Sequence, residues 1–281
     1  MTTAAYETLR VERLLEGALC RITLSRVDVR NAQDRRMLAE LNHAFTAAAD
    51  DDDVKVVILA ADGPHFSSGH DLSDAQRWSC HPRDITGGFD AEPAGISRGF
   101  AKAGAEGYLA YEEEIYLGLC RRWYDLPKPT IAQVHGKAIA GGLMLMWVCD
   151  LIVASEDALF ADPTLRFGVN GVEWFAHPWE LGPRKAKEML FTGDFLTAAE
   201  ARERGMVNQV VPPDQLESYT VELATRIAAN SSFALKLAKM AVNQTVEAQG
   251  FGIAQKAAFS LHQLGHADMR ERSVRTEAAG S

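Results

Sequence analysis

The chain has 281 residues, of which 47% are hydrophobic, and a formal net charge of −9. A chain of this length buries roughly 70–75% of the surface that its unfolded form exposes, so the composition excludes a disordered or low-complexity protein. The balance of 29 basic and 38 acidic residues argues against a nucleic-acid binder, which needs a basic face. An anionic small ligand stays compatible with it, because local basic groups and backbone amides bind anions.

The apolar runs and the cysteines indicate the compartment. The longest apolar run, residues 138–149, has 12 residues and is too short for the roughly 20 that a membrane-spanning helix needs. The first residues show no secretory signal pattern, and the four cysteines have no metal-binding or redox spacing. We therefore expect a soluble cytoplasmic protein with free thiols and no membrane partner.

Strand-like and helix-like segments alternate along the first two-thirds of the chain. Strands are expected at residues 18–24, 54–60, 130–134 and 151–154. A helix is expected between the first two, because apolar residues recur at helical spacing from Met37 to Ala48. This alternation predicts an α/β architecture.

After about Gly193 the pattern becomes helical. Thr197 and Glu200 form a capping-box pattern, and Asp214 is positioned to cap a further helix with an apolar stripe from Leu216 to Ile227. We expect one compact core over residues 1–200 and a helical oligomerisation region over residues 201–281.

Residues 73–107 form a long stretch without a clear period. It is rich in Gly, Asp and Ala, which is typical of a functional loop, and we expect Trp78, Phe89 and Phe100 to shape a substrate pocket there.

The sequence lacks the phosphate-binding loop, the zinc-protease motif and the serine nucleophile elbow. His262 and His266 are four residues apart, but no acidic residue near them in the sequence completes a metal site. We therefore expect a solvated helix face there, and no metal. The acidic run at residues 50–53 lacks the spacing of a calcium loop and is expected to be a solvated turn.

Two glycine-containing segments, residues 65–72 and 134–144, follow predicted strands and lead into helical patterns. A helix N-terminus carries unpaired backbone N–H groups and a partial positive charge. Two such amides that converge on one point would form an oxyanion hole. The alternative is that these glycines only permit tight turns.

These segments carry a resemblance to a known family. FSSGHDL at residues 66–72 and VHGKAIAGG at residues 134–142 are similar to two signatures of the crotonase (enoyl-CoA hydratase/isomerase) superfamily. Residues 22–34, 160–168 and 190–212 resemble further blocks in the family order. The resemblance implies a spiral of repeated ββα units that assembles as a homotrimer or a dimer of trimers through its C-terminal helices. It also implies an acyl-CoA thioester as ligand, with coenzyme A as part of the substrate and no separate cofactor.

Carried over by position, the resemblance assigns the oxyanion hole to the amides of Ser68 and Gly141. Arg30 matches a basic position near the coenzyme A phosphates. The segment from Ser68 through Gly69, His70, Asp71 and Leu72 would run along the adenine and pantetheine. Asp71 is also a candidate for a local cap rather than a ligand of the substrate.

The chain departs from the family at the acid/base positions. Hydratases of this family carry two glutamates where this sequence has Met144 and Thr164, and neither side chain transfers protons at neutral pH. Other branches carry an acidic residue in the segment that holds Glu173, which is therefore the candidate base. Because Val172 and Trp174 flank it, we expect its pKa to be raised.

Three further polar residues lie in or near these segments. Asp162 is expected to cap a turn, whereas His70 and His177 are candidate pocket groups. One acid/base makes isomerisation or thioester hydrolysis at least as plausible as hydration. The alternative of a different class is a non-catalytic acyl-CoA binder.

Overall fold

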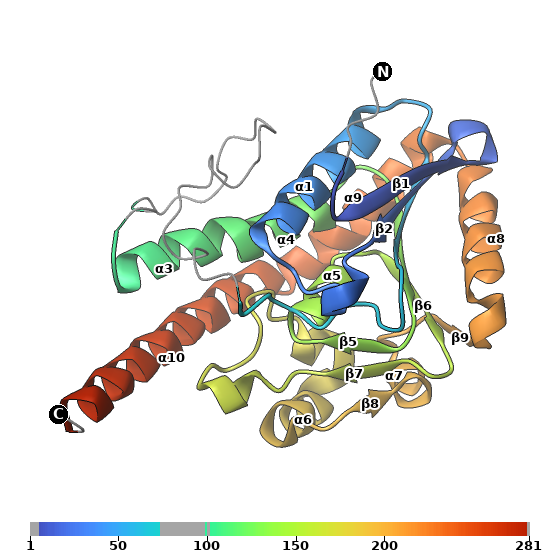
Figure 1. The fold of residues 1–281 in the computed structure, drawn as a ribbon. Helices are drawn as coiled ribbons and strands as arrows, with labels where there is room; N and C mark the ends of the chain where they lie inside the picture. The colour runs from blue at the N-terminus through green and yellow to red at the C-terminus, as the bar shows by residue number, and fades with distance from the viewer. Residues whose placement is uncertain (1–5, 74–98, 100–101, 280–281) are drawn as a thin grey trace.

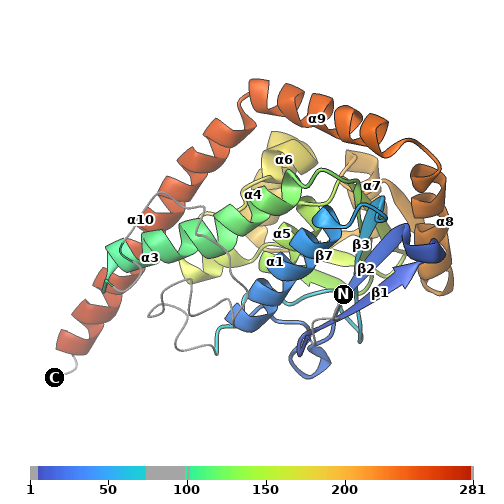
Figure 2. The same cartoon turned by 90° about the horizontal axis from the view of Figure 1, so that it is seen from above.

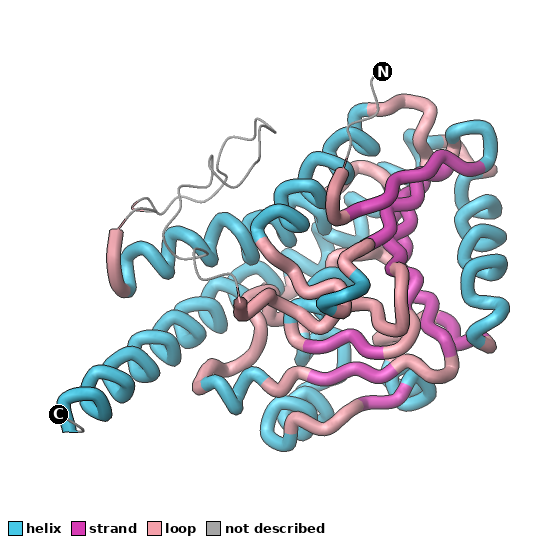
Figure 3. The backbone as a smooth tube through the Cα atoms, viewed as in Figure 1, coloured by secondary structure: helices cyan, strands magenta, loops and turns pink. Residues whose placement is uncertain are grey.

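The computed structural model describes residues 6–73, 99 and 102–279, and the side chains up to residue 272. The larger sheet contains β1 (Leu9–Leu14), β2 (Leu19–Leu24), β3 (Val56–Ala61), β4 (Thr130–Val134), β6 (Leu151–Ser155) and β9 (Gln209–Val211), in that order. Only β1 is antiparallel to its neighbour. A smaller sheet contains β5 (Lys137–Ile139), β7 (Leu159–Ala161) and β8 (Leu196–Thr197), and it lies below the larger one in Figure 3.

The helices are α1 (Arg35–Asp50), α3 (Ala105–Glu112), α4 (Leu119–Tyr124), α5 (Gly141–Trp147), α6 (His177–Thr192), α7 (Ala198–Arg204), α8 (Leu216–Ala228), α9 (Ser232–Ala248) and α10 (Phe251–Ala279). A π-helical turn, Glu113–Gly118, joins α3 to α4. Short 3₁₀ turns occur at Leu15–Gly17, Val27–Val29, Thr164–Phe167 and Pro213–Gln215. Figures 1 and 2 show α10 running alongside α3 at one side of the molecule, after α9 has crossed the top in Figure 2.

The larger sheet is covered on both faces, and the alternation of side chains along β3 shows why. Val56 and Ile58 pack in the apolar cluster that contains residues of α8, whereas Val57 and Leu59 belong to the main core with α1 and α5. All four side chains are fully buried, so the continuous apolar run of this strand has no polar face. The four predicted strands and the helix between the first two are confirmed.

The C-terminal third also contributes to the core sheet, which corrects the predicted boundary at residue 200. β9 pairs in parallel with β6, with Val210 opposite Ala154. This strand has only three residues, too few for a period to be visible in the sequence. The N-terminal strand β1 was not predicted either, since half of its six residues are charged and it lies at the edge of the sheet.

Of the two helix caps predicted in this region, the one at Thr197 is confirmed and the one at Asp214 is wrong. The Thr197–Glu200 capping box is present, and the helix that it starts ends at Gly205 with a φ of 84°. Asp214 instead lies inside the 3₁₀ turn before α8, and its side chain makes no capping hydrogen bond. The predicted apolar stripe of α8, from Leu216 to Ile227, is present and packs on the sheet.

The predicted loop at residues 73–107 falls mostly outside the described residues, together with Trp78, Phe89 and Phe100. Its end is helical, because α3 begins at Ala105. None of the described helices has the length and apolarity required to cross a bilayer.

Candidate active site

The two glycine-containing segments meet between the two sheets. The Ser67 amide donates to the Lys137 carbonyl over 3.1 Å, and the Ile139 amide donates to the Ser67 carbonyl over 3.0 Å. Gly69 has a φ of 93°, and a Cβ built on it would lie 2.8 Å from the Ile139 oxygen and 3.1 Å from the Gly141 nitrogen. A side chain at this position is therefore excluded both by the backbone conformation and by the close approach.

The amide expected from Ser68 is not available to a ligand, so that assignment is wrong. The Ser68 N–H donates to the Arg30 carbonyl over 3.0 Å, and the Gly69 N–H donates to a neighbouring serine hydroxyl. Neither the His70 nor the Gly141 amide donates to any described residue. The next residue along, His70, thus supplies the second unpaired amide beside Gly141.

The turn before Gly141 is strained in a way that presents its amide. Ala140 has a φ of 48°, a left-handed value that alanine rarely adopts. Gly141 is the first residue of α5, so its N–H belongs to the unpaired, partly positive end of a helix. Held strain of this kind is typical of functional sites.

The imidazole of His70 lies against Gly141. Its ring stacks on Tyr116 with the centroids 3.8 Å apart, and its Nε2 lies 3.0 Å from Oε2 of Glu173. Its buried Nδ1 has no hydrogen-bond partner among the described residues, and a Cβ built on Gly141 would lie only 2.7 Å from it. The predicted pocket group His70 and the predicted base Glu173 are therefore one hydrogen-bonded pair beside the two free amides.

Glu173 is 3% exposed, and its Oε1 lies 3.6 Å from Nε2 of His262. Burial alone would raise the pKa of Glu173, but the nearby imidazoles of His70 and His262, and the hydrogen bond from His70, outweigh burial and hold that pKa well below its usual value. The predicted rise is wrong because the sequence showed only the apolar neighbours Val172 and Trp174. At neutral pH Glu173 is a carboxylate that accepts hydrogen bonds.

Asp162 and His177 form a second, separate pair. The His177 Nε2 lies 2.8 Å from Oδ2 of Asp162, and both side chains are fully buried. The same carboxylate accepts the Thr164 and Val172 amides, each over 3.1 Å. The capping prediction for Asp162 is confirmed, whereas His177 is a core histidine and not a pocket group.

The remaining predicted residues lie around this centre. Met144 is buried in α5, and Thr164 is half-buried at the start of a 3₁₀ turn. Arg30 is exposed and Leu72 is 64% exposed, so both side chains are accessible to a ligand. The Asp71 carboxylate accepts hydrogen bonds from Ser73 and from Arg26, which makes it a local cap.

The structure adds residues that the sequence did not assign to the site. The prediction that His262 and His266 on α10 face solvent is wrong. His262 is 3% exposed, and both histidines lie against the buried carboxylate of Glu112. The four-residue spacing of the histidines was the available signal. Glu112 could not be linked to them, because it lies 150 residues earlier than His262 in the chain.

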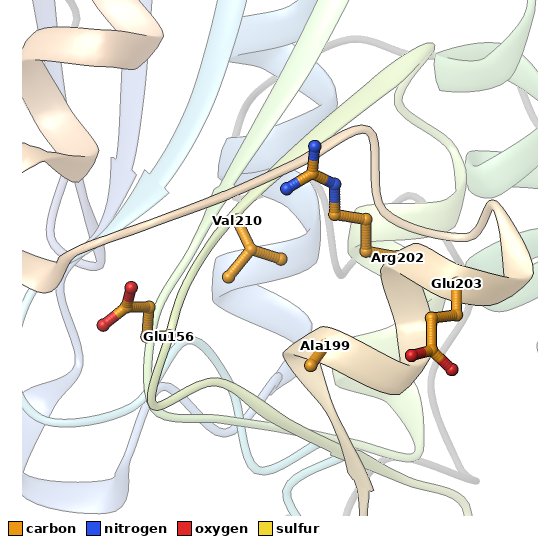
Figure 4. Close-up of a pocket in the computed structure, with 5 residues that line it drawn as sticks. All are labelled: Glu156, Ala199, Arg202, Glu203 and Val210. Atoms are coloured by element: carbon orange, nitrogen blue, oxygen red, sulfur yellow. The ribbon is translucent and has the colours of Figure 1, made fainter.

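A surface pocket elsewhere on the molecule carries none of these groups. It is lined by Glu156, Ala199, Arg202, Glu203 and Val210, from α7, β9 and the turn after β6 (Figure 4). None of the predicted site residues lines it.

Comparison with known proteins identifies relatives over nearly the whole chain. The family model for enoyl-CoA hydratase/isomerase matches residues 15–91 and 99–276. A protein of Mycobacterium tuberculosis named "Putative enoyl-CoA hydratase EchA13" is 48% identical over 267 residues, which are 95% of this chain and 83% of the relative.

Solved structures agree with this match. A "probable enoyl-CoA hydratase" from Mycobacterium smegmatis is 45% identical, with a TM-score of 0.83 and coverage of 95% of this chain and 97% of the other. An enoyl-CoA hydratase/isomerase from Xanthobacter autotrophicus Py2 is 34% identical, with a TM-score of 0.77 and coverage of 94% and 88%. The chain has the crotonase fold and belongs to the enoyl-CoA hydratase/isomerase family.

Proposed function

We propose that the protein is an acyl-CoA enzyme that stabilises a thioester enolate with the backbone amides of His70 and Gly141 and moves a proton with the His70–Glu173 pair. The observation that carries this proposal is the juxtaposition itself. Two unpaired amides lie next to a pair formed by the half-buried imidazole of His70 and the buried carboxylate of Glu173, whose Nε2–Oε2 distance is 3.0 Å. Preorganised amides of this kind stabilise negative charge that develops on a carbonyl oxygen.

The pair divides the acid/base work between its members. With the ring proton on Nε2 donated to Glu173, the lone pair of His70 Nδ1 is directed at the region beside Gly141. Nδ1 then takes a proton from C2 of the acyl chain, and the anionic Glu173 stabilises the resulting imidazolium. This makes His70 the proton-transferring group and Glu173 the residue that orients it and balances its charge, a refinement of the predicted role of Glu173.

The reaction that needs only this pair is a proton shift. Removing a proton at C2 and returning it at C4 moves a double bond from C3–C4 to C2–C3, with the electrons held meanwhile on the enolate oxygen. Thioester hydrolysis also needs a single general base. Hydration by the two-glutamate route has no support, because Met144 and Thr164 hold those positions.

The rim of the site supports coenzyme A as the carrier. Arg30 is an exposed cation whose own backbone carbonyl accepts the Ser68 amide. Leu72, four residues after Ser68, presents an exposed apolar side chain. We place the coenzyme A phosphates near Arg30 and its adenine near Leu72. Gly69 gives the pantetheine close access to the backbone.

We also propose that the chain assembles as a homotrimer or a dimer of trimers, in the cytoplasm. Four apolar side chains of α9 are exposed in the single chain: Phe233, Leu237, Met240 and Val242. α10 adds Ile253, Leu261 and Leu264. Exposed apolar side chains on two consecutive helices support a subunit interface.

A panel of thioesters tests the activity. The enzyme proposal predicts turnover of at least one enoyl- or acyl-CoA, with 3-enoyl-CoA favoured over crotonyl-CoA. Stabilisation against heat by acyl-CoA without any product would instead support a non-catalytic binder, the reading that the loss of both glutamates favours. Turnover of crotonyl-CoA at the rates of 3-enoyl-CoA would contradict the proton-shift mechanism.

A further inference from the structure

Three donor side chains meet in the interior, next to the acid/base pair but outside it. His262 and His266 lie one turn apart on α10, and Glu112 is the last residue of α3. Glu112 is 1% exposed and His262 is 3% exposed, while the side chain of His266 is 14% exposed. Two imidazoles and a carboxylate are thus held together across two helices, shielded from bulk water.

The donor atoms have the spacing of a metal coordination shell. The two Nε2 atoms are 3.0 Å apart, and Glu112 oxygens lie 3.0 Å from Nε2 of His266 and 3.6 Å from Nε2 of His262. Bonds of about 2.0–2.1 Å to a tetrahedral metal place ligand atoms roughly 3.3–3.4 Å apart. The observed distances bracket that value.

The hydrogen bond at Nδ1 of His262 suits a metal ligand. Its Nδ1 lies 2.7 Å from the Gly171 carbonyl oxygen, which can only accept, so Nδ1 carries a proton. In the neutral ring the lone pair is therefore on Nε2, which points at His266 and Glu112. Outer hydrogen bonds of this type fix the tautomer of metal-bound histidines. Gln263 likewise donates to Glu112 and fixes its carboxylate.

The charges favour a cation at this point. Glu112 and Glu173 are both buried, and the charged or chargeable groups that contact them among the described residues are the imidazoles of His70, His262 and His266. Buried carboxylates need compensation. A divalent ion within reach of Glu112 would balance both charges.

We propose that Glu112, His262 and His266 bind a divalent transition metal, with zinc as the best match to two imidazoles and one carboxylate. The site would clamp α10 to α3 and to the Gly171 turn, behind the His70–Glu173 pair. Oε1 of Glu173, 3.6 Å from Nε2 of His262, lies at its edge. This inference does not depend on the proposed reaction, because metal binding is measured without a substrate.

The test is metal binding by the full-length chain, prepared without a histidine tag and stripped with EDTA. We expect one Zn²⁺ per chain by mass spectrometry after ZnCl₂ is added and the excess removed, together with a higher melting temperature. Titration with CoCl₂ should give the intense visible bands of four-coordinate cobalt. The wild-type titrations need no variant to fold.

Variants then locate the site. His266→Gln should weaken metal binding by more than the roughly 10–100-fold that loss of an outer-shell partner costs. His43→Gln is the matched control, since His43 is a half-buried histidine of α1 with a hydrogen bond to Tyr6, and it should bind metal like the wild type. Two results would overturn the proposal and leave a proton-bridged cluster. One is that the stripped wild type does not bind zinc stoichiometrically at micromolar concentration, and the other is an unchanged cobalt spectrum in His266→Gln.

Discussion

His70 contributes two different groups to the candidate site. Its backbone amide is unpaired beside Gly141, and its imidazole is fixed by Glu173 on one side and stacked on Tyr116 on the other. A side chain that is held at both the ring face and Nε2 keeps Nδ1 in one place. The precision that proton transfer requires is therefore built into a single residue and its two neighbours.

Gly141→Pro removes one of the two amide donors. Proline is tolerated at the first position of a helix, so the change deletes the N–H without breaking the helix, but its Cβ also presses on the His70 imidazole, which lies 2.7 Å from that position. We expect turnover of an active thioester to fall by roughly 10²–10³-fold or more. The assay is steady-state kinetics on a variant whose circular dichroism and melting temperature match the wild type. Near wild-type turnover in that folded variant would rule out the oxyanion role of Gly141.

Glu173→Gln keeps the shape of the side chain and removes its charge. The imidazolium of His70 then loses its stabilising partner, and we expect turnover to fall by about 10²–10⁴-fold while acyl-CoA affinity stays within a few-fold. Turnover and calorimetric binding should be measured on the same preparation. Asp157→Asn, an exposed carboxylate outside the site, is the control. Unchanged turnover in Glu173→Gln would remove the pair from the mechanism.

Met144→Glu combined with Thr164→Glu restores the two carboxylates that hydration uses in this family. If the surrounding cradle is intact, crotonyl-CoA hydration should rise from a very low wild-type level. Loss of absorbance of the conjugated thioester reports the reaction. Robust hydration by the wild type would show that other residues position the water.

At the scale of elements, the turn between β7 and α6 depends on one buried carboxylate. Asp162 accepts the Thr164 and Val172 amides and binds His177. Burial raises the pKa of Asp162. The hydrogen bonds and the nearby imidazole lower it by more than burial raises it, so the pKa lies below the ordinary value. A lowered pKa adds stability that is present above the unfolded pKa, near 4, and is lost as the pH falls through the folded pKa.

Asp162→Ala should therefore lower the free energy of unfolding by about 3–5 kcal/mol at pH 7, because it leaves buried donors without an acceptor. The difference from the wild type should shrink as the pH falls below about 4, because the carboxylate of the unfolded chain then binds a proton while that of the folded chain is still ionised. Urea denaturation at pH 7 and pH 3.5 measures both values. Asp157→Ala serves as the exposed control. A loss that is equal at the two pH values would contradict the linkage.

Elements with strong periodicity could be predicted from the sequence, and short or edge elements could not. β3 and α1 are long apolar or amphipathic segments, and the capping box of α7 is local chemistry. β9 is three residues long and gains its stability from pairing with β6. Such strands exist because of the partner and not because of their own residues.

The same division holds for the site. Gly141 was assigned from the family resemblance, and the helix start after a strand that the sequence predicts there is present. Ser68 could not be excluded from the sequence, since only the structure shows that its amide already donates to the Arg30 carbonyl. The partners of Glu173 come from 103 and 89 residues away, so its pKa depended on contacts that no local pattern encodes.

At the scale of the whole molecule, the apolar surface of α9 should determine the assembly state. Leu237→Glu with Met240→Glu places two charges in the proposed interface, and we expect single chains where the wild type sediments as three or six. Leu15→Glu, an exposed apolar residue in the turn after β1, should leave the assembly unchanged. Sedimentation velocity distinguishes these outcomes, and a wild type that sediments as a single chain would refute the interface.

The central claim is that the site generates an enolate, and exchange of the C2 protons of a saturated acyl-CoA in D₂O measures this directly. Butyryl-CoA has no double bond to shift, so NMR detects proton removal and return without depending on the natural substrate. We predict that the wild type exchanges the C2 protons and that Glu173→Gln and Gly141→Pro slow this exchange at least 100-fold. The account would be contradicted if the wild type binds butyryl-CoA without exchanging its C2 protons. It would also be contradicted if Glu173→Gln exchanges them at the wild-type rate.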